Sequence, residues 1–287
     1  MKIGVALSGG GIKGIAHAGA LKAIEDIGIK VDIIGGTSSG SLVAALYAMG
    51  FKPKDILKLF NENADKIVKI GKNPIISSIG SYIRKKQIKI KGLKTGNTLE
   101  TLYDQIAKEK GIFNINQIKM PLVIPSVDIL NSKEYIFTNK LPTGNKNIDQ
   151  YITDINIGKA VRASSSFSAV FSPCEYKNHA FIDGGALNNI PVNEVKKQGA
   201  DKVIAIKFDS DLITNKSNIM DIAFKTIDIM GNKICEKNLQ MSDYIVNVSA
   251  ENIGFLDTKQ MNKCFDAGYD AVINNANDIK NILYKNL

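Results

Sequence analysis

The pentapeptide Gly36-Thr37-Ser38-Ser39-Gly40 lies between two apolar segments and decides the fold expected around it. Residues 31–34 (Val-Asp-Ile-Ile) predict a strand before it, and residues 41–47 (Ser-Leu-Val-Ala-Ala-Leu-Tyr) predict a helix after it. Gly-x-Ser-x-Gly in this setting is typical of a nucleophile elbow, in which Gly36 and Gly40 keep a sharp turn uncrowded. We therefore expect Ser38 to be a nucleophile at a helix N-terminus. The alternative is an ordinary glycine-rich turn whose serine caps the helix.

A second glycine-rich loop stands at the beginning of the sequence. Residues 2–7 predict a strand, residues 15–25 predict a helix, and Gly9-Gly10-Gly11-Ile12-Lys13-Gly14 lies between them. Three consecutive glycines leave backbone N–H groups uncovered, so this loop could hold a phosphate or form an oxyanion hole for acyl transfer.

The phosphate alternative has some support, because Gly9, Gly11 and Gly14 spell the dinucleotide pattern Gly-x-Gly-x-x-Gly. A dinucleotide fold also needs an acidic residue at the end of the second strand. Asp32 lies near the start of that strand instead, and the serine elbow occupies its end. A P-loop is excluded, since no Gly-Lys-Ser/Thr follows the glycines.

A carboxylate ends a short apolar stretch in Phe181-Ile182-Asp183-Gly184-Gly185. By itself, Asp-Gly indicates a hairpin turn. Beside a candidate nucleophile, Asp183 becomes the candidate base, because a serine hydroxyl needs a group that accepts its proton.

Histidine is the usual base for serine, and the chain has only two histidines. His17 lies on the first predicted helix, where we expect it to serve in packing or hydrogen bonding. His179 follows the serine, so a triad of Ser38, His179 and either Asp128 or Asp154 remains an alternative. The early position of the elbow and the polar, turn-like surroundings of His179 weigh against that triad.

These segments together resemble the patatin-like phospholipase family. The resemblance covers about residues 3–207 and rests on Gly-Gly-Gly-x-Lys-Gly at 9–14, Gly-Thr-Ser-Ser-Gly at 36–40, the Ala-Ser block at 163–173, Asp-Gly-Gly-Ala at 183–186 and Asn-Ile-Pro-Val at 189–192. It implies a Ser38–Asp183 dyad and an oxyanion hole from Gly9, Gly10 and Gly11. Lys13, Gly14, Gly36, Gly40, Gly184 and Gly185 support these motifs. One departure is Ser168, where the family usually carries proline, and it affects the local shape of the loop.

The resemblance also implies hydrolysis of carboxylic ester bonds in phospholipids or related acyl lipids through an acyl-enzyme, without metal or cofactor. An aspartate can act as the base only where it is desolvated and the oxyanion is well stabilised. A small-ester esterase or thioesterase at the same site is an alternative. Another is a non-catalytic protein that binds acyl lipid or nucleotide, against which the intact Ser38, Asp183 and glycine loop argue.

Strand-like and helix-like segments alternate to the end of the sequence, without a proline-rich or serine-rich linker and without a repeat. Further strands are predicted at 201–208 and 244–248, and further helices at 217–241 and 261–283. This order predicts one domain over residues 1–287, a three-layer α/β/α fold with a mostly parallel central sheet, which residues 208–287 complete.

The positive charge is concentrated in one segment. The chain has 37 basic and 28 acidic residues, and residues 66–94 contain nine of the basic ones and none of the acidic ones. Isoleucines and Tyr82 would lie on one face of a helix there, which suggests contact with an anionic membrane; a solvated cap that packs on the body is the alternative. Nucleic-acid binding is not expected, because only Tyr82 lies among the cations.

Cysteine content and hydropathy predict a cytoplasmic protein, and the basic segment at 66–94 predicts peripheral attachment to the membrane surface. Cys174, Cys235 and Cys264 are few and odd in number, which favours buried thiols over a disulfide framework. We expect no secretory segment and no membrane-spanning stretch.

Overall fold

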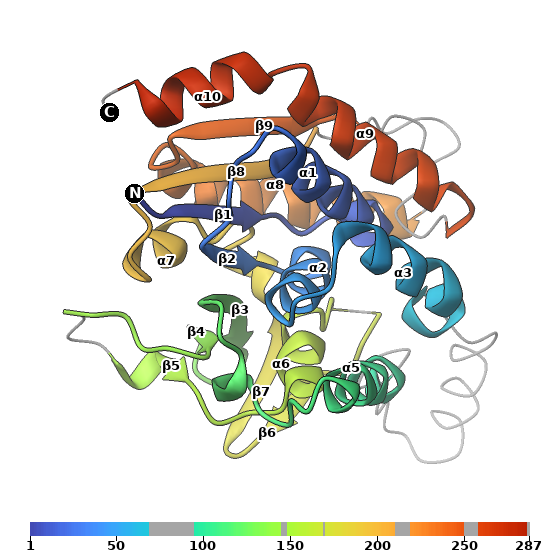
Figure 1. Ribbon diagram of the computed structural model, residues 1–287. Coiled ribbons are helices and arrows are strands. Elements are labelled where there is room, and N and C mark those ends of the chain that lie inside the picture. Colours follow the sequence, from blue (N-terminus) through green and yellow to red (C-terminus); the bar gives the residue numbers. More distant parts are fainter. Residues whose placement is uncertain (69–94, 145–147, 169, 210–218, 250–257, 286–287) are drawn as a thin grey trace, which may run out of the picture.

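A computed structural model of the chain describes residues 1–68, 95–144, 148–168, 170–209, 219–249 and 258–285 (Figure 1). Within these residues the strands are β1 (Ile3–Leu7), β2 (Ile33–Gly36), β3 (Leu122–Asp128), β4 (Lys133–Thr138), β5 (Tyr151–Ile152), β6 (Cys174–Tyr176), β7 (His179–Asp183), β8 (Lys202–Phe208) and β9 (Tyr244–Val248). The helices are α1 (Ala16–Asp26), α2 (Ser39–Ala48), α3 (Pro53–Val68), α5 (Asn97–Glu109), α6 (Ile157–Ser164), α7 (Val192–Lys197), α8 (Ile219–Leu239), α9 (Met261–Ile273) and α10 (Ala276–Tyr284). Short 3-10 turns are η1 (Gly11–Ile15), η2 (Ile115–Gln117), η3 (Ile148–Gln150), η4 (Gly184–Ala186) and η5 (Thr258–Gln260).

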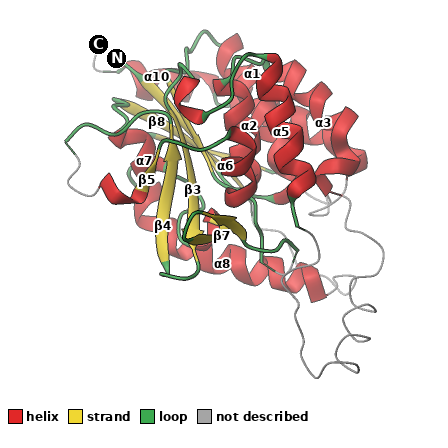
Figure 2. Cartoon of the chain, turned by 90° about the horizontal axis from the view of Figure 1, so that it is seen from below, coloured by secondary structure: helices red, strands yellow, loops and turns green. Residues whose placement is uncertain are grey.

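The strands form one mixed sheet in the order β5-β4-β3-β2-β1-β8-β9, and its centre from β3 to β9 is parallel. Every residue of β1, β2 and β3 is buried, as expected for strands covered on both faces. Helices α1, α2, α3, α5, α6 and α9 pack on one face, and α7 and α8 lie on the other (Figure 2). The predicted three-layer α/β/α fold is confirmed.

One irregularity of the sheet brings distant parts of the sequence together. β4 pairs with one edge of β3 along nearly its full length. Both β2 and β7 pair with the other edge of β3. β2 pairs in parallel with the start of β3, and β7 pairs antiparallel with its end, where Asp183 lies opposite Ser126. Because the two strands run toward each other along the same edge, their carboxyl ends meet.

The C-terminal elements extend the same layers. β9 pairs with β8 at the edge of the sheet, and α9 packs against α1. The strand predicted at 244–248 is confirmed with those bounds, and the helix predicted at 217–241 is α8. The three cysteines are buried thiols, as predicted.

The basic segment at 66–94 lies almost entirely outside the described residues, since the description of this part of the chain ends at Val68 and resumes at Thr95. The prediction that this segment contacts membrane therefore stays a prediction. Within the part of the chain that the structure describes, no helix has the length and hydrophobicity to cross a bilayer.

Candidate active site

Ser38 lies at the turn between β2 and α2 with a strained backbone. Its φ is 52° and its ψ is −122°, a backbone conformation that residues other than glycine rarely adopt. The two motif glycines are required by close approach: a Cβ on Gly36 would lie 2.3 Å from the carbonyl oxygen of Gly40, and one on Gly40 would lie 2.5 Å from that of Leu7. The turn therefore has the geometry of the predicted elbow.

The hydroxyl of Ser38 donates a hydrogen bond to the carboxylate of Asp183, with 2.6 Å between Oγ and Oδ2. The other carboxylate oxygen accepts from the N–H of Gly185 at 2.8 Å. Burial raises the pKa of Asp183 from 3.8 to about 6, against the lowering effect of these two hydrogen bonds. Asp183 is thus a desolvated carboxylate that faces the serine, and Gly184 and Gly185 form η4 directly after it.

The first glycine loop lies against this elbow. The N–H of Gly9 donates to both the carbonyl oxygen and the side-chain oxygen of Asn189, at 3.2 and 3.1 Å. Gly9 is therefore a support of the loop, and this hydrogen bond does not favour the predicted use of its N–H as an oxyanion donor. Gly10 and Gly11 follow at the start of η1, where no preceding turn of helix can accept from their N–H groups.

The two remaining residues of that motif are buried. Lys13 is buried within η1. A Cβ on Gly14 would lie 2.5 Å from the Cβ of Ser39, so glycine at this position lets the loop approach the elbow.

The Ala-Ser block braces the elbow, a role that sequence reasoning did not assign to individual residues. The N–H of Ser38 donates to Ser164 Oγ at 3.1 Å, and Ser165 Oγ donates to the carbonyl of Ser38 at 3.2 Å. The N–H of Asp183 donates to the carbonyl of Ser166 at 3.0 Å. The block therefore contacts both members of the predicted dyad, and its three consecutive serines were the available signal. Asn189 was also missed as the residue that holds Gly9.

Neither histidine reaches the serine. His17 is buried and donates from Nε2 to the carbonyl of Ser8 at 2.8 Å, and burial lowers its pKa to about 4. His179 pairs with Asp128 at 2.8 Å, and hydrogen bonds from His179 and Ala180 hold the pKa of Asp128 low although burial raises it. His179 and Asp183 stand at opposite ends of β7, about 13 Å apart by strand rise. The alternative triad is therefore wrong: Ser38 hydrogen-bonds to Asp183 instead.

The dinucleotide alternative also fails on geometry. Asp32 lies just before β2, at the amino end of the strand, where its carboxylate accepts from the N–H of Ile3 and pairs with Lys30. That end of the sheet is opposite the carboxyl edge at which the glycine loop lies, so Asp32 cannot meet a ribose bound at the loop.

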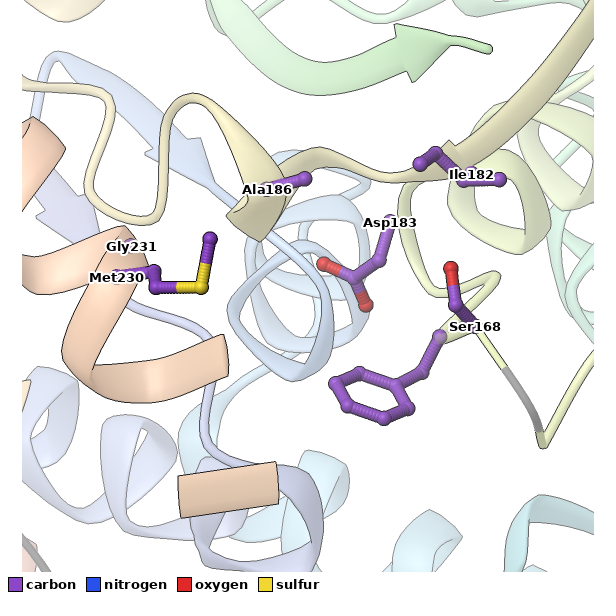
Figure 3. A pocket seen from close by; sticks show the side chains of 7 residues that line it. Ser168, Ile182, Asp183, Ala186, Met230 and Gly231 are labelled. Carbon is purple, nitrogen blue, oxygen red and sulfur yellow. The ribbon is translucent and has the colours of Figure 1, made fainter. Parts of the chain in front are cut away.

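A pocket of about 120 Å³ opens beside Asp183. Figure 3 shows the carboxylate between Met230 of α8 on one side and Ser168 on the other. Its lining consists of Phe167, Ser168, Ile182, Asp183, Ala186, Met230 and Gly231. Most of these side chains are apolar, so the pocket suits an aliphatic group next to a reacting ester.

Acyl transfer needs a nucleophile, a proton acceptor and donors for the oxyanion, and the carboxyl edge of the sheet brings residues of all three kinds together. The fold and the site thus have the arrangement of an α/β hydrolase. Within that class, the chain belongs to the patatin-like phospholipase family, whose model matches residues 5–196.

Curated relatives agree with this assignment. The lysophospholipase NTE1 of Eremothecium gossypii is 31% identical over 211 residues, and that of Candida albicans is 30% identical over 210 residues. Each match covers 72% of this chain but only 12% or 13% of the relative, so the chain spans about an eighth of these proteins' length. Among solved structures, VipD from Legionella pneumophila matches with a TM-score of 0.54 at 16% identity, over 96% of this chain and 67% of VipD, which shows the shared fold.

Proposed function

We propose that the protein is a serine lipid acyl hydrolase that cleaves carboxylic ester bonds of phospholipids or related acyl lipids through a Ser38–Asp183 dyad. The observation that carries the proposal is the 2.6 Å hydrogen bond from Ser38 Oγ, on its strained elbow, to the buried carboxylate of Asp183. Residues 1–287 would act as a single patatin-like domain, with the elements after residue 207 as part of its layers.

In the proposed mechanism, Ser38 Oγ attacks the ester carbonyl carbon while Asp183 accepts its proton. The negative charge that develops on the carbonyl oxygen is stabilised by the N–H groups of Gly10 and Gly11. The carbon–oxygen bond to the leaving alcohol then breaks, and Asp183 returns the proton to that alcohol. Water next attacks the acyl-enzyme, and Asp183 accepts a proton from it. The bond between the acyl carbon and Ser38 Oγ then breaks, Asp183 returns the proton to Oγ, and fatty acid leaves.

The raised pKa of Asp183 supports this role. A carboxylate with an ordinary pKa is a weak base at neutral pH, and catalysis by a general base is most effective when its pKa lies near the working pH. With a pKa of about 6, Asp183 is largely ionised at neutral pH and yet more basic than an exposed aspartate. Burial, which raises this pKa, also strengthens its interaction with the serine hydroxyl.

The substrate class is supported by the family and by the apolar pocket beside Asp183. Phe167, Ile182 and Met230 give that pocket aliphatic and aromatic walls. The curated relatives are named lysophospholipases, which suggests that acyl chains of phospholipids are the groups transferred.

The test is fatty-acid release from mixed phospholipid vesicles by the wild type and by Ser38→Ala, without added metal. We expect release by the wild type and a loss of at least about 10³-fold in the variant, since the nucleophile is removed. Equal release by both proteins would refute the dyad. If neither protein acts on vesicles, hydrolysis of p-nitrophenyl butyrate and of a short acyl thioester by the wild type distinguishes an esterase or thioesterase from a protein that only binds lipid.

A further inference from the structure

Helix α8 presents apolar side chains to solvent. Ile222, Ile229, Met230 and Ile234 are 51%, 56%, 59% and 48% exposed, respectively. Their spacing of i, i+7, i+8 and i+12 places them on one face of the helix. The solvent side of a surface helix is ordinarily polar, so four large apolar side chains on that side of α8 indicate a surface that another apolar phase covers.

The opposite side of α8 fixes the helix to the candidate active site. A Cβ on Gly231 would lie 2.7 Å from the carbonyl oxygen of Gly185, so glycine lets the helix backbone approach η4 closely. One turn later, buried Cys235 Sγ lies 3.0 Å from the N–H of Asn189, the residue that holds Gly9. The helix is thus packed against the loop that follows Asp183 while its other face remains open.

Met230 joins the exposed face to the catalytic pocket. Its side chain lines the pocket together with Asp183 (Figure 3), and it is also the most exposed of the apolar side chains that the structure describes on α8. A protein bound on this face would close one side of the pocket to substrate. A lipid surface on the same face would bring acyl chains to the pocket edge, so the position of Met230 favours lipid as the occupant.

The charges on α8 agree with a lipid surface. Lys233 and Lys237 are exposed on the same side of the helix as the isoleucines, and Lys233 pairs with Glu236. A lysine can extend its ammonium group toward phosphate head groups while its aliphatic stem stays near the apolar layer. Around the helix axis, Lys233 and Lys237 fall between Ile229 and Ile234, so both lysines lie on the side of α8 that would meet the head groups.

From these observations we propose that the exposed face of α8, formed by Ile222, Ile229, Met230 and Ile234, docks on a phospholipid bilayer, and that acyl chains reach the pocket past Met230. The docking step gives the proposed lipid hydrolase its route to substrate, and the acyl-chain route rests on that proposed function. The binding of vesicles by α8 can be measured without catalysis.

Binding is therefore tested in full-length Ser38→Ala protein, with vesicles of phosphatidylcholine and phosphatidylglycerol. The α8 variant carries Ile229→Gln and Ile234→Gln, because glutamine keeps helix propensity while it removes the apolar side chains. The matched control carries Ile273→Gln and Ile282→Gln at the end of α9 and on α10, which lies at the top of Figure 2 whereas α8 lies at the bottom. We expect the vesicle partition coefficient to fall about tenfold or more in the α8 variant and to stay within about twofold in the control.

Equal vesicle binding by the α8 variant and its parent, with the same thermal midpoint, would overturn the proposal. So would a parent that elutes as a dimer in gel filtration and an α8 variant that elutes as a monomer, since a second copy would then cover this face.

Hydrolysis with Ser38 intact separates this inference from the proposed function. The α8 variant should release fatty acid from vesicles about tenfold more slowly while its turnover of soluble p-nitrophenyl butyrate stays within about twofold of wild type. Unchanged vesicle hydrolysis would overturn the docking role. If wild type hydrolyses neither substrate but the difference in vesicle binding persists, the proposed function and the acyl-chain route fail while the docking surface stands.

Discussion

Substitution of Asp183 by asparagine should separate the catalytic value of the buried carboxylate from its cost in stability. Asparagine has nearly the same shape, and its side-chain oxygen can still accept from the N–H of Gly185 while its amide group faces Ser38. It cannot accept the proton of the serine hydroxyl. We expect the activity of Asp183→Asn on a soluble ester to fall roughly 10²–10⁴-fold, the usual contribution of a general base.

The contribution of Asp183 to the free energy of unfolding follows from the shift of its pKa on folding. Folding raises this pKa from 3.8 to about 6, so the native state holds a proton that the unfolded chain releases. The resulting stabilisation is fully present below pH 3.8 and is lost as the pH rises through about 6. A shift of about two pKa units corresponds to about 3 kcal/mol of the free energy of unfolding.

The assay compares the thermal midpoints of wild type and Asp183→Asn from pH 4 to pH 8. Because every other ionisable group is present in both proteins, their contributions cancel in the difference. Relative to the variant, wild type should lose up to about 3 kcal/mol over this range, or several degrees in Tm. In parallel, the activity of wild type should rise through pH 6 as Asp183 loses its proton. Midpoints that run parallel across the range would show that the carboxylate is not desolvated, and an active variant would refute its role as base.

Three further changes probe the surroundings of the dyad. Ser38→Gly should abolish ester hydrolysis and raise the free energy of unfolding by about 1 kcal/mol, since glycine adopts the backbone angles that strain Ser38. A lower Tm than that of wild type would argue against that strain. Asn189→Ala should lower kcat on a soluble ester about tenfold, because the N–H of Gly9 keeps only the backbone carbonyl of residue 189 as its acceptor and the loop is held less firmly. Unchanged kcat would remove the side chain of Asn189 from a positioning role. His179→Ala should keep activity within about threefold of wild type while stability falls by about 1–3 kcal/mol, since the buried carboxylate of Asp128 loses one of its hydrogen-bond donors. Loss of activity at unchanged stability would revive a histidine base.

Much of the site could be predicted from local sequence because its motifs are local structures. The elbow around Ser38 needs glycines on both sides within five residues, and Gly36 and Gly40 are required by contacts within the turn or with the adjacent β1. The alternation of strand-like and helix-like segments likewise predicts the layers, because the spacing of apolar residues within each segment indicates which of its faces is buried. Residues 66–94 show the limit of this reasoning, since their charge pattern alone does not say what they contact.

Other features depend on residues that are far apart in the chain. Asp183 lies 145 positions from Ser38 in the sequence. The two residues meet because β2 pairs with the start of β3 and β7 pairs with the end of the same edge. The engagement of Gly9 by Asn189 and the exposed face of α8 beside the pocket arise in the same way. Desolvation is a property of this packing, so no local pattern could predict the raised pKa of Asp183.

The sequence by itself therefore determined the family, the nucleophile candidate and the layered α/β architecture, because each of these can be predicted from short-range patterns of glycine, serine and apolar residues. The tertiary structure alone decided how closely Asp183 approaches Ser38 and how far it is desolvated, which glycine N–H groups remain at the start of η1, and which helix borders the pocket. The physical reason is that hydrogen bonding and burial at the site are set by strand pairing and helix packing across the whole sheet, which bring together residues that the sequence keeps apart.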